Sequence, residues 1–240
     1  MLYVVGFGSG ARECMTAAAE QAMLQSDIII GYKTYTALMK PFFPDKTFLE
    51  NGMRQETERV RLAMEQAQDK TVSLICSGDP ELYGMAALAY EYLAEFPETE
   101  ITVIPGITAA FSGGAVLGAP LTHDTAIISL SDLLTPAEKI ARRLRCAAEA
   151  DFTIVLYNPS SKQRADYLQK ACDIILQYRA PETVCGYVRN IGRDGESSHI
   201  CTLAELRNET VDMFTTVYIG NSETKIISGK MITPRGYRYV

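Results

Sequence analysis

Three loops of this chain combine glycine with polar residues that could contact a ligand. They are Gly6–Ala11, Ser77–Met85 and Pro105–Ala110. Each loop follows a short apolar run that predicts a β-strand. Open α/β sheets bind ligands beyond the carboxyl ends of their strands, where glycine lets the backbone come close to the ligand. The cluster therefore predicts a shared ligand site, and it does so more strongly than any single loop.

The first loop also fits a dinucleotide-binding pattern. Gly6, Gly8 and Ala11 match the spacing G-x-G-x-x-[GA]. That interpretation requires an acidic residue at the end of the next strand, where it would hold a ribose. The predicted next strand instead ends at Gly31-Tyr32, and Asp27 stands before it. A nicotinamide cofactor is therefore disfavoured, and the loop taken alone could equally be a packing turn.

Polar side chains in the other two loops have two interpretations each. The carboxylate of Asp79 could accept hydrogen bonds from a ligand, or it could cap the helix that follows. The spacing favours neither. Thr108 likewise places a capping or ligand-facing hydroxyl beside small residues. Both residues are candidates for ligand contact.

Composition and charge exclude several classes of protein. Apolar residues make up 47% of the 240 residues and charged residues 22%, which predicts a large buried core rather than disorder. The net charge of −6 argues against a sequence-independent nucleic-acid binder. Ten of the fourteen arginines lie after residue 120. They could form a surface that receives an anionic ligand, or they could be scattered and solvated.

Targeting and redox features predict a cytoplasmic protein. No basic segment precedes an apolar stretch at the start, which argues against a secretory signal. The uncharged stretch 101–122 contains two prolines and four glycines, so we interpret it as a strand, a turn and a packed helix rather than a membrane span. The six cysteines are scattered and only His123 and His199 accompany them. We therefore expect reduced thiols and no protein-held metal.

Short β-rich runs alternate with helical stretches along the chain, which is typical of an α/β fold. We expect two α/β domains, residues 1–118 and 119–240. The expected strands are Leu2–Val5, Asp27–Gly31, Thr71–Cys76, Ile101–Ile104, Thr125–Leu130, Phe152–Tyr157, Thr183–Val188, Thr215–Gly220 and Lys225–Ile227. The last two could form a hairpin around Asn221-Ser222.

These loops resemble those of the tetrapyrrole methylases, the class III S-adenosylmethionine methyltransferases. The resemblance rests on Gly6–Gly10, on Ser77–Pro80 with Tyr83-Gly84, and on Pro105–Ala110. Longer strings in the second half narrow it to the C17-methyltransferases that act on precorrin-3B or cobalt-factor III in cobalamin (vitamin B12) biosynthesis. They are Leu117–Asp124, Ile128–Pro136, Leu156–Pro159, Val188–Glu196, Thr215–Ser222 and Met231–Tyr237. The similarity spans essentially the whole chain.

The resemblance implies two α/β domains joined by a short linker, with S-adenosylmethionine in the cleft between them, and a homodimer. Carried over by position, donor contacts in the first domain would be Gly8, Ser9, Ser77, Gly78, Asp79, Leu82, Thr108 and Ala109. Those in the second domain would be Tyr157, Asn158, Asn190, Ile191, Ile232 and Thr233.

The chain departs from the family pattern at three of the loop positions. The family usually has proline where Ser9 stands and glycine where Ala11 stands, and relatives often have glycine where Glu81 stands. The first loop is expected to face either the tetrapyrrole or the donor. Its role in this chain is therefore open.

The activity that the resemblance implies is methylation of ring carbon C17 with contraction of the macrocycle, and S-adenosylhomocysteine is the other product. Methyl transfer requires the nucleophile, the methyl and the sulfur to be held in line. Ring contraction moves protons, so polar groups near the macrocycle should matter. The candidates are His123, Asp124, Ser131, Asp132, Arg189, Arg193 and Glu196. The arginines suit the carboxylates of a tetrapyrrole, although each could form an ordinary ion pair, and His123 could be an ordinary surface or core histidine.

Two other functions stay open. A sibling methylase acting on another ring carbon or on a porphyrinoid would share the glycine loops, but the strings Ser129–Pro136 and Arg189–Glu196 disfavour it. A non-catalytic ligand-binding or scaffold protein could keep the same fold. Retention of Asp79 and Thr108 with the strand-end glycines argues against a protein that has lost donor binding. We expect a tetrapyrrole as the partner, with no nucleic acid and no membrane, and the sequence does not tell whether the substrate contains cobalt.

Overall fold

The computed structural model describes residues 1–161 and 164–237. Contacts divide the chain into two compact units, Met1–Ala109 (unit 1) and Ala110–Val240 (unit 2). Each unit combines a β-sheet with helices, so the predicted α/β class is confirmed. The helix of small residues groups with unit 2, whereas a division after residue 118 would assign it to the first domain. The division after residue 118 stays a prediction.

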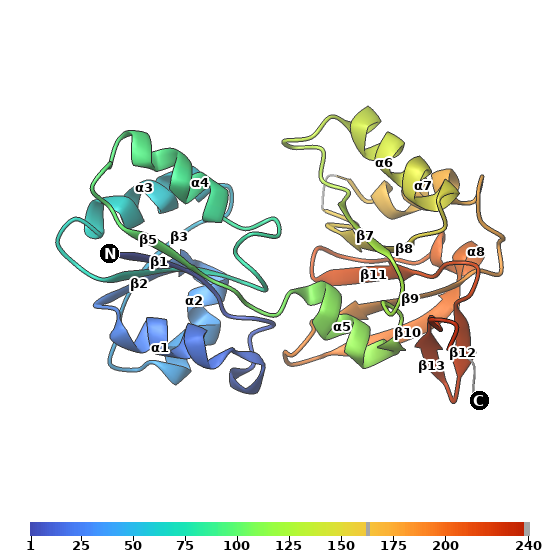
Figure 1. The fold of residues 1–240 in the computed structure, drawn as a ribbon, viewed down its shortest axis with the longest axis horizontal. Coiled ribbons are helices and arrows are strands. Elements are labelled where there is room, and N and C mark those ends of the chain that lie inside the picture. The colour runs from blue at the N-terminus through green and yellow to red at the C-terminus, as the bar shows by residue number, and fades with distance from the viewer. Residues whose placement is uncertain (162–163, 238–240) are drawn as a thin grey trace. The chain divides into compact units, whose positions relative to one another are not determined.

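Unit 1 is built on a parallel sheet of five strands in the order β3-β2-β4-β1-β5 (Figure 1). The strands are β1 (Leu2–Gly6), β2 (Ile28–Tyr32), β3 (Thr47–Asn51), β4 (Val72–Cys76) and β5 (Ile101–Ile104). Every neighbouring pair is parallel. The carboxyl ends of all five strands therefore lie at one edge of the sheet.

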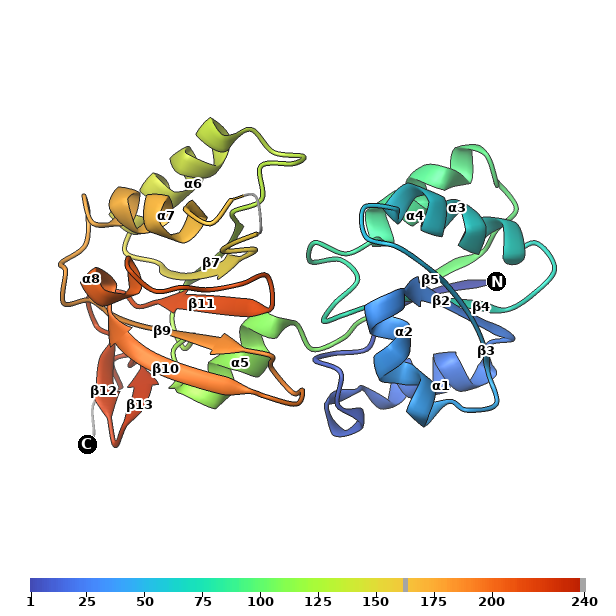
Figure 2. The ribbon, with the colours of Figure 1, turned by 180° about the vertical axis from the view of Figure 1, so that it is seen from behind.

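Helices cover both faces of this sheet. They are α1 (Ala17–Gln25), α2 (Lys33–Met39), α3 (Glu56–Gln66) and α4 (Ala86–Glu91), with 3-10 turns at Arg12–Cys14, Lys40–Phe42 and Tyr92–Ala94. Because successive strand residues point to opposite faces, Val4 packs with α3 and α4 whereas Val5 packs with α1 and α2. Figure 2 shows the two helix pairs on opposite sides of the sheet. Thr16 caps α1 by accepting the N–H of Ala19 at 3.1 Å.

Unit 2 holds a second five-stranded sheet, in the order β10-β9-β11-β8-β7. The strands are β7 (Thr125–Ser129), β8 (Thr153–Tyr157), β9 (Val184–Arg189), β10 (Ser197–Thr202) and β11 (Thr215–Ile219). β7 and β8 are parallel, β11 runs antiparallel to β8 and β9, and β10 runs antiparallel to β9. The ends of β7, β8 and β9 therefore share one edge with the starts of β10 and β11. We call this the strand-end edge of unit 2.

Helices pack on both faces of the second sheet. α6 (Ala137–Glu149), α7 (Tyr167–Ile175) and α8 (Leu203–Leu206) cover one face and share its apolar cluster. α5 (Ala109–Leu117) lies on the other face, where the buried Tyr218 donates its hydroxyl to the carbonyl of Ala110 at 3.1 Å. A side chain at Gly113 would overlap that hydroxyl. Glycine is therefore required for α5 to approach the sheet this closely.

Three short strands form a small third sheet in unit 2. They are β6 (Gly118–Ala119), β12 (Lys225–Ile227) and β13 (Lys230–Ile232), in the order β12-β13-β6. The expected hairpin of β12 with Thr215–Gly220 is wrong, because β12 pairs with β13 and β11 pairs within the large sheet. Ser228 and Gly229 have φ of 50° and 73°, as a two-residue hairpin turn requires. The Asn221 side chain instead accepts hydrogen bonds locally, from the Glu223 N–H and the Thr224 hydroxyl at 3.1 Å each.

Three thiols are buried in the core of unit 2. Cys185 and Cys201 face each other across β9 and β10, and Cys172 of α7 belongs to the same apolar cluster. Burial raises the pKa of Cys172 and of Cys201 to about 12, and that of Cys185 well above its ordinary value. The folded chain therefore keeps these protons at pH values where the unfolded chain releases them.

We expect the free energy of unfolding to fall as the pH rises above about 9, because a group whose pKa is raised by folding loses its stabilising contribution as the pH rises from its unfolded pKa to its folded pKa. Each such thiol should contribute about 1.4 kcal/mol per pH unit in the window up to its folded pKa. Urea denaturation at about pH 8 and about pH 10 measures this dependence. Cys172→Ala should flatten it and Cys146→Ala, at an exposed cysteine, should not. Identical pH dependence in the two variants would contradict the assignment.

Candidate active site

The first two glycine loops meet at the carboxyl edge of unit 1. β1 and β4 are neighbours, and the helices that follow them, α1 and α4, lie on opposite faces (Figure 1). Open α/β sheets bind ligands at such a switch point. Here the N–H of Gly8 donates to the carbonyl of Gly78 at 3.1 Å, and the N–H of Gly78 donates to that of Gly8 at 2.7 Å. Both residues are left-handed, with φ of 73° and 71°, which favours glycine at each position.

The third loop joins the other two through Gly106. A side chain at Gly106 would overlap the carbonyl oxygens of both Gly78 and Gly6. Next to this contact, a Cβ atom at Gly78 would stand 3.6 Å from Cα of Thr108 and 3.7 Å from N of Ala109. The three loops that the sequence groups together therefore form one continuous backbone surface.

Asp79 ties these loops together. One carboxylate oxygen accepts the N–H of Glu81 at 2.8 Å and that of Leu82 at 3.2 Å, and the other oxygen accepts the N–H of Gly106 at 3.1 Å. The first two bonds stay within the turn after β4, so the alternative that Asp79 caps the next helix is wrong: the N-cap of α4 is Met85. The bond to Gly106 is long-range and fixes the third loop. Asp79 therefore shapes the loop surface from within.

The remaining donor candidates of unit 1 surround this surface. Ser9 and Thr108 are buried, and Ser77 and Leu82 are half-buried. The neighbouring Tyr83 has a φ of 58° and is 53% exposed. A left-handed non-glycine residue stores strain, and such residues concentrate at functional loops. The turn after Asp79 is therefore the strained part of the candidate site.

At the strand-end edge of unit 2, Ser129 connects β7 with β8. Its hydroxyl oxygen accepts Nδ2 of Asn158 at 2.9 Å and the N–H of Ser131 at 3.3 Å. Asn158 itself is left-handed, with a φ of 53°. The hydroxyl of Tyr157 accepts the N–H of Ala110 at 2.8 Å and so fixes the start of α5. The Tyr157 side chain therefore anchors the start of α5, whereas Asn158 has a strained backbone conformation.

The end of β9 carries Arg189 and Asn190. Nη2 of Arg189 donates to the carbonyl of Thr210 at 3.0 Å, and its Nε lies 3.5 Å from a carboxylate oxygen of Asp212. Asn190 is left-handed, with a φ of 52°, and its N–H donates to the carbonyl of Phe214 at 3.1 Å. Arg189 thus makes the ion pair that the sequence leaves open, while its guanidinium keeps partial exposure at the strand-end edge.

A tight loop after β9 holds Arg193 and Glu196. The Glu196 carboxylate accepts the N–H of Gly192 at 2.7 Å, and its own N–H donates to the carbonyl of Arg193 at 3.1 Å. Gly192 and Gly195 are left-handed at φ of 65° and 77°. The carboxylate of Glu196 therefore stabilises the loop that presents Arg193 beside Asn190.

Asp132 follows β7 and forms an ion pair with Arg164. A carboxylate oxygen of Asp132 lies 3.0 Å from Nη2 of Arg164, and both side chains are about 70% buried, with exposures of 30% and 28%. Arg164 also lies over the Tyr167 ring at 5.7 Å. Burial raises the pKa of Tyr167. The three side chains link the loop after β7 to the loop after β8.

His123 and Asp124 stand at the other end of the same sheet. They precede β7, and the carbonyl of Asp124 accepts the N–H of Thr153 at the start of β8, at 3.0 Å. Nδ1 of His123 accepts the N–H of Asp124 at 2.9 Å. The five residues of β7 place these two about 13 Å from the strand-end edge. The structure does not bring them to the other five catalytic candidates.

The last three donor candidates are part of the packing of unit 2. Ile191 is buried against α5, where a Cβ atom at Gly113 would stand 2.7 Å from its Cδ1. Thr233 is fully buried, and its hydroxyl donates to the carbonyl of Pro120 at 2.7 Å. Ile232 is half-buried in β13. These side chains offer apolar shape rather than polar groups.

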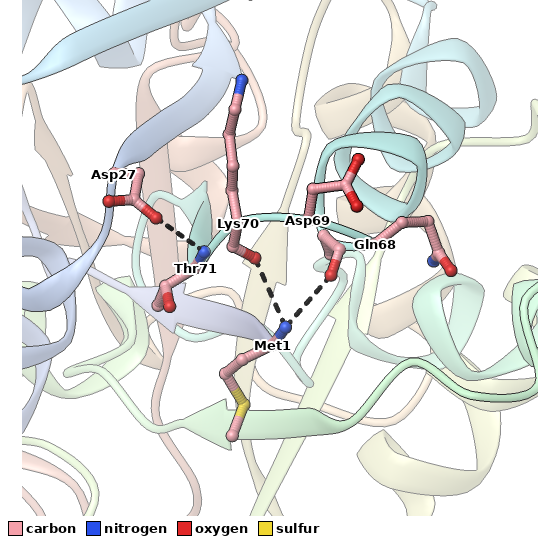
Figure 3. Close-up of a pocket in the computed structure, with 7 residues that line it drawn as sticks. Met1, Asp27, Gln68, Asp69, Lys70 and Thr71 are labelled. Carbon is pink, nitrogen blue, oxygen red and sulfur yellow. Dashed lines mark hydrogen bonds between the residues drawn. The ribbon is translucent and has the colours of Figure 1, made fainter.

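A polar pocket opens at the opposite edge of the unit 1 sheet (Figure 3). It has a volume of about 310 Å³ and is lined by Met1, Asp27, Ala67, Gln68, Asp69, Lys70 and Thr71. The Met1 ammonium donates to the carbonyls of Ala67 at 3.1 Å and Lys70 at 3.4 Å (Figure 3). These residues flank the starts of β1, β2 and β4. The pocket therefore lies away from the three glycine loops, and no predicted site residue lines it.

Among residues 1–161 and 164–237, no helix combines the length and apolar character needed to cross a bilayer. In the same part of the chain, no group of three His, Cys, Asp or Glu side chains is placed to hold a metal ion.

The family model for tetrapyrrole (corrin/porphyrin) methylases matches residues 1–207. The chain belongs to this family. The match covers all of unit 1 and the strands β7 to β10 of unit 2. The glycine loops around Asp79 are thus those of a tetrapyrrole methylase, as their resemblance predicts.

Several proteins are similar to this methylase over nearly its whole length. A probable cobalt-factor III C17-methyltransferase of Methanocaldococcus jannaschii is 45% identical, over 99% of this chain and 98% of the relative. One of Salmonella typhimurium is 44% identical, over 99% of each. The crystal structure of the methyltransferase CobJ superposes with a TM-score of 0.89 at 33% identity, over 97% of this chain and 99% of that one. Two further relatives, from Archaeoglobus fulgidus and Priestia megaterium, are longer, and the methylase spans about half of their length, 52% and 45%.

Three residues that organise the methylase's strand-end edge are missed by sequence reasoning. Ser129 bonds two loops, Arg164 pairs with Asp132, and Asp212 pairs with Arg189. Ser129 lies in the segment Ile128–Pro136, near the end of an expected strand. This position could have identified it as a candidate site residue. Arg164 and Asp212 belong to no motif, and their partners are distant in sequence. Only the tertiary structure identifies them.

Proposed function

We propose that this methylase transfers a methyl group from S-adenosylmethionine to C17 of a cobalamin precursor, with contraction of the macrocycle. The observation that carries the proposal is the 44–45% identity, over the full chain, to relatives named as cobalt-factor III C17-methyltransferases. The fold of the methyltransferase CobJ supports it. The test is mass spectrometry of the tetrapyrrole after anaerobic incubation with the donor. Gain of one methyl with formation of S-adenosylhomocysteine supports the proposal, and an unmethylated product contradicts it.

The loop surface of unit 1 fits the donor. Gly8, Gly78 and Gly106 bring bare backbone to a switch point of the sheet, where a ligand can contact N–H and C=O groups directly. Around it we propose donor contacts from Ser9, Ser77, Asp79, Leu82, Thr108 and Ala109. The donor supplies an electrophilic methyl group on a sulfonium. The residues need only hold it in line with the attacking carbon, which can contribute about 7–11 kcal/mol in favourable cases.

The strand-end edge of unit 2 suits a tetrapyrrole with carboxylate side chains. Arg189 and Arg193 offer the cations that such carboxylates require. Ser131 and Glu196 remain candidates for handling protons during ring contraction, whereas the Asp132 carboxylate is engaged in its ion pair with Arg164. Asn158 and Asn190 are proposed to contact ligand from their strained positions, with Tyr157 and Ile191 shaping the surface beside them. Ile232 and Thr233 are left out because the Thr233 hydroxyl bonds Pro120 and Thr224, which lie at the opposite end of the sheet. His123 and Asp124 are left out because they stand at the opposite end of the sheet.

A cobalt-containing substrate is the better candidate of the two precursors. The relatives named for cobalt-factor III are 44–45% identical, whereas a precorrin-3B C17-methyltransferase of Sinorhizobium sp is 36% identical. We expect kcat/KM to be higher for cobalt-factor III by about tenfold or more, equivalent to about 1.4 kcal/mol in the transition state. A competition assay with both tetrapyrroles under strict anaerobiosis measures this ratio. Equal or faster turnover of precorrin-3B would contradict the preference.

The same assay separates the sibling activity. Methylation at a carbon other than C17, or of a porphyrinoid in place of either precursor, would identify a related methylase. We also propose a cytoplasmic homodimer, as the resemblance implies. Sedimentation equilibrium of the purified protein tests the dimer, and a single species at the monomer mass would contradict it.

A further inference from the structure

The loop between β7 and α6 exposes two neighbouring leucines. Leu133 is 54% exposed and Leu134 is 98% exposed. A single exposed leucine needs no explanation, but an adjacent pair at a functional edge costs solvation that a ligand or partner would recover. The pair follows the strand end that carries Ser131, on the strand-end edge of unit 2.

This loop is held in place at its base. The N–H of Leu130 donates to the carbonyl of Tyr157 at 2.9 Å, and that of Ser131 donates to the Ser129 hydroxyl at 3.3 Å. Asp132, immediately before the leucines, pairs with Arg164 at 3.0 Å. Hydrogen bonds and an ion pair therefore hold the loop that carries the exposed leucines.

Arg164 is itself fixed by the loop after β8. Its backbone N–H donates to the carbonyl of Ser161 at 3.0 Å and its carbonyl accepts the Ser161 N–H at 3.3 Å. Its guanidinium lies over the ring of Tyr167. The Asp132–Arg164 pair thus connects the loop after β7 to the residues around Arg164.

The apolar pair and the cations stand apart on the same edge. Three strand spacings separate β7 from β9 in the order β9-β11-β8-β7, which is about 14 Å. Arg189 ends β9, and the half-exposed Phe214 precedes β11 between them. The strand-end edge thus carries exposed apolar side chains and a cation, which suits an apolar ligand with carboxylates at its rim.

We propose that Leu133 and Leu134 hold the apolar face of the tetrapyrrole, and that the Asp132–Arg164 ion pair positions them. In this assignment Asp132 is a positioning residue and does not transfer protons. The inference rests on the proposed function, because it assigns the substrate's binding residues. The tetrapyrrole is the ligand proposed for the two leucines because its carboxylates match the cation of Arg189 on the same edge.

The test compares Leu134→Ser, Asp132→Ala, Arg164→Ala and the double variant Asp132→Ala/Arg164→Ala. We expect Leu134→Ser to raise KM for the tetrapyrrole about ten- to a hundredfold, the effect of exposing one buried leucine. The kcat and the donor Kd from calorimetry should change by less than about twofold. Leu24→Ser, at a leucine of α1 that is 45% exposed in unit 1, is the matched control and should leave all three unchanged.

The ion pair gives a second readout. Asp132→Ala and Arg164→Ala should each raise KM for the tetrapyrrole, and the double variant should raise it no further, because both residues act through one interaction. The pH profile of kcat should keep its shape in all three variants. A kcat loss confined to Asp132→Ala, with an altered pH profile, would overturn the positioning role and make Asp132 a proton-transfer residue.

Three further outcomes separate the possibilities. If the wild-type protein methylates no tetrapyrrole, the proposed function fails before any variant is compared. If the wild type is active and Leu134→Ser keeps its KM, the inference fails alone. Conversion of a dimer to a monomer by Leu134→Ser, with unchanged KM, would show that the loop contacts a second copy of the chain and would also overturn it.

Discussion

Asp79→Ala is expected to weaken binding of S-adenosylmethionine at least about a hundredfold, or about 2.7 kcal/mol. The carboxylate accepts three backbone N–H groups from two loops, those of Glu81, Leu82 and Gly106. Hydrogen bonds to a charged group contribute about 1.5–3 kcal/mol each. Without them the turn after β4 and the loop after β5 lose their common anchor. The donor surface then loses its shape, in addition to the proposed contact of Asp79 with the donor.

Calorimetry with S-adenosylmethionine measures this effect, and circular dichroism shows that the variant is folded. Asp79→Asn keeps one acceptor oxygen and should give an intermediate loss of about tenfold. Asp27→Ala is the matched control, because Asp27 also accepts a backbone N–H, that of Thr71 at 2.9 Å, at the opposite edge of the same sheet. A folded Asp79→Ala protein with wild-type donor affinity would refute the role of this carboxylate.

Gly106→Ala is expected to lower the free energy of unfolding by at least about 2 kcal/mol and to abolish donor binding. The added Cβ would overlap the carbonyl oxygens of Gly78 and Gly6, and backbone cannot move aside as a flexible side chain can. The β5 loop must therefore shift away from β1 and β4. Elsewhere, a Gly→Ala change that fits commonly stabilises a protein by about 0.4–1 kcal/mol.

Urea denaturation and donor calorimetry of the same variant check the two parts of this prediction. Gly229→Ala serves as the control, because nothing lies within 4 Å of its added Cβ and only its φ of 73° is unfavourable. It should cost about 1–2 kcal/mol from backbone strain and leave donor binding intact. Normal donor affinity in Gly106→Ala would show that the three loops do not form one binding surface.

Most central strands could be predicted from the sequence, because burial on both faces gives them continuous apolar runs. Thr71–Cys76 begins one residue before β4, and Leu2–Val5 ends one residue before β1. The sequence indicates neither β6 nor β13 of the small sheet, and in the five-stranded sheets it does not indicate β3 and β10. Both are edge strands of their sheets, and β10 has three exposed residues at its start. A strand with one side toward solvent carries polar residues and loses the apolar signal.

The candidate site was predictable only in part. The loops of unit 1 were found because parallel strands place all their carboxyl ends together, so sequence order alone identifies the shared edge. Unit 2 mixes parallel and antiparallel pairs, and sequence order does not tell which strand ends coincide. His123 was grouped with Arg189 for this reason. Its position before β7 sets it at the opposite end.

The position of the transferred methyl group tests the proposed methylation of C17 most directly. Incubation of the protein with cobalt-factor III and a donor whose methyl carries carbon-13, followed by conversion of the product to a diamagnetic form, allows carbon NMR to locate it. The proposed function predicts one labelled methyl on C17 in a contracted ring. A label on any other ring carbon would identify a sibling methylase, and an unlabelled macrocycle beside intact donor would contradict the proposed reaction.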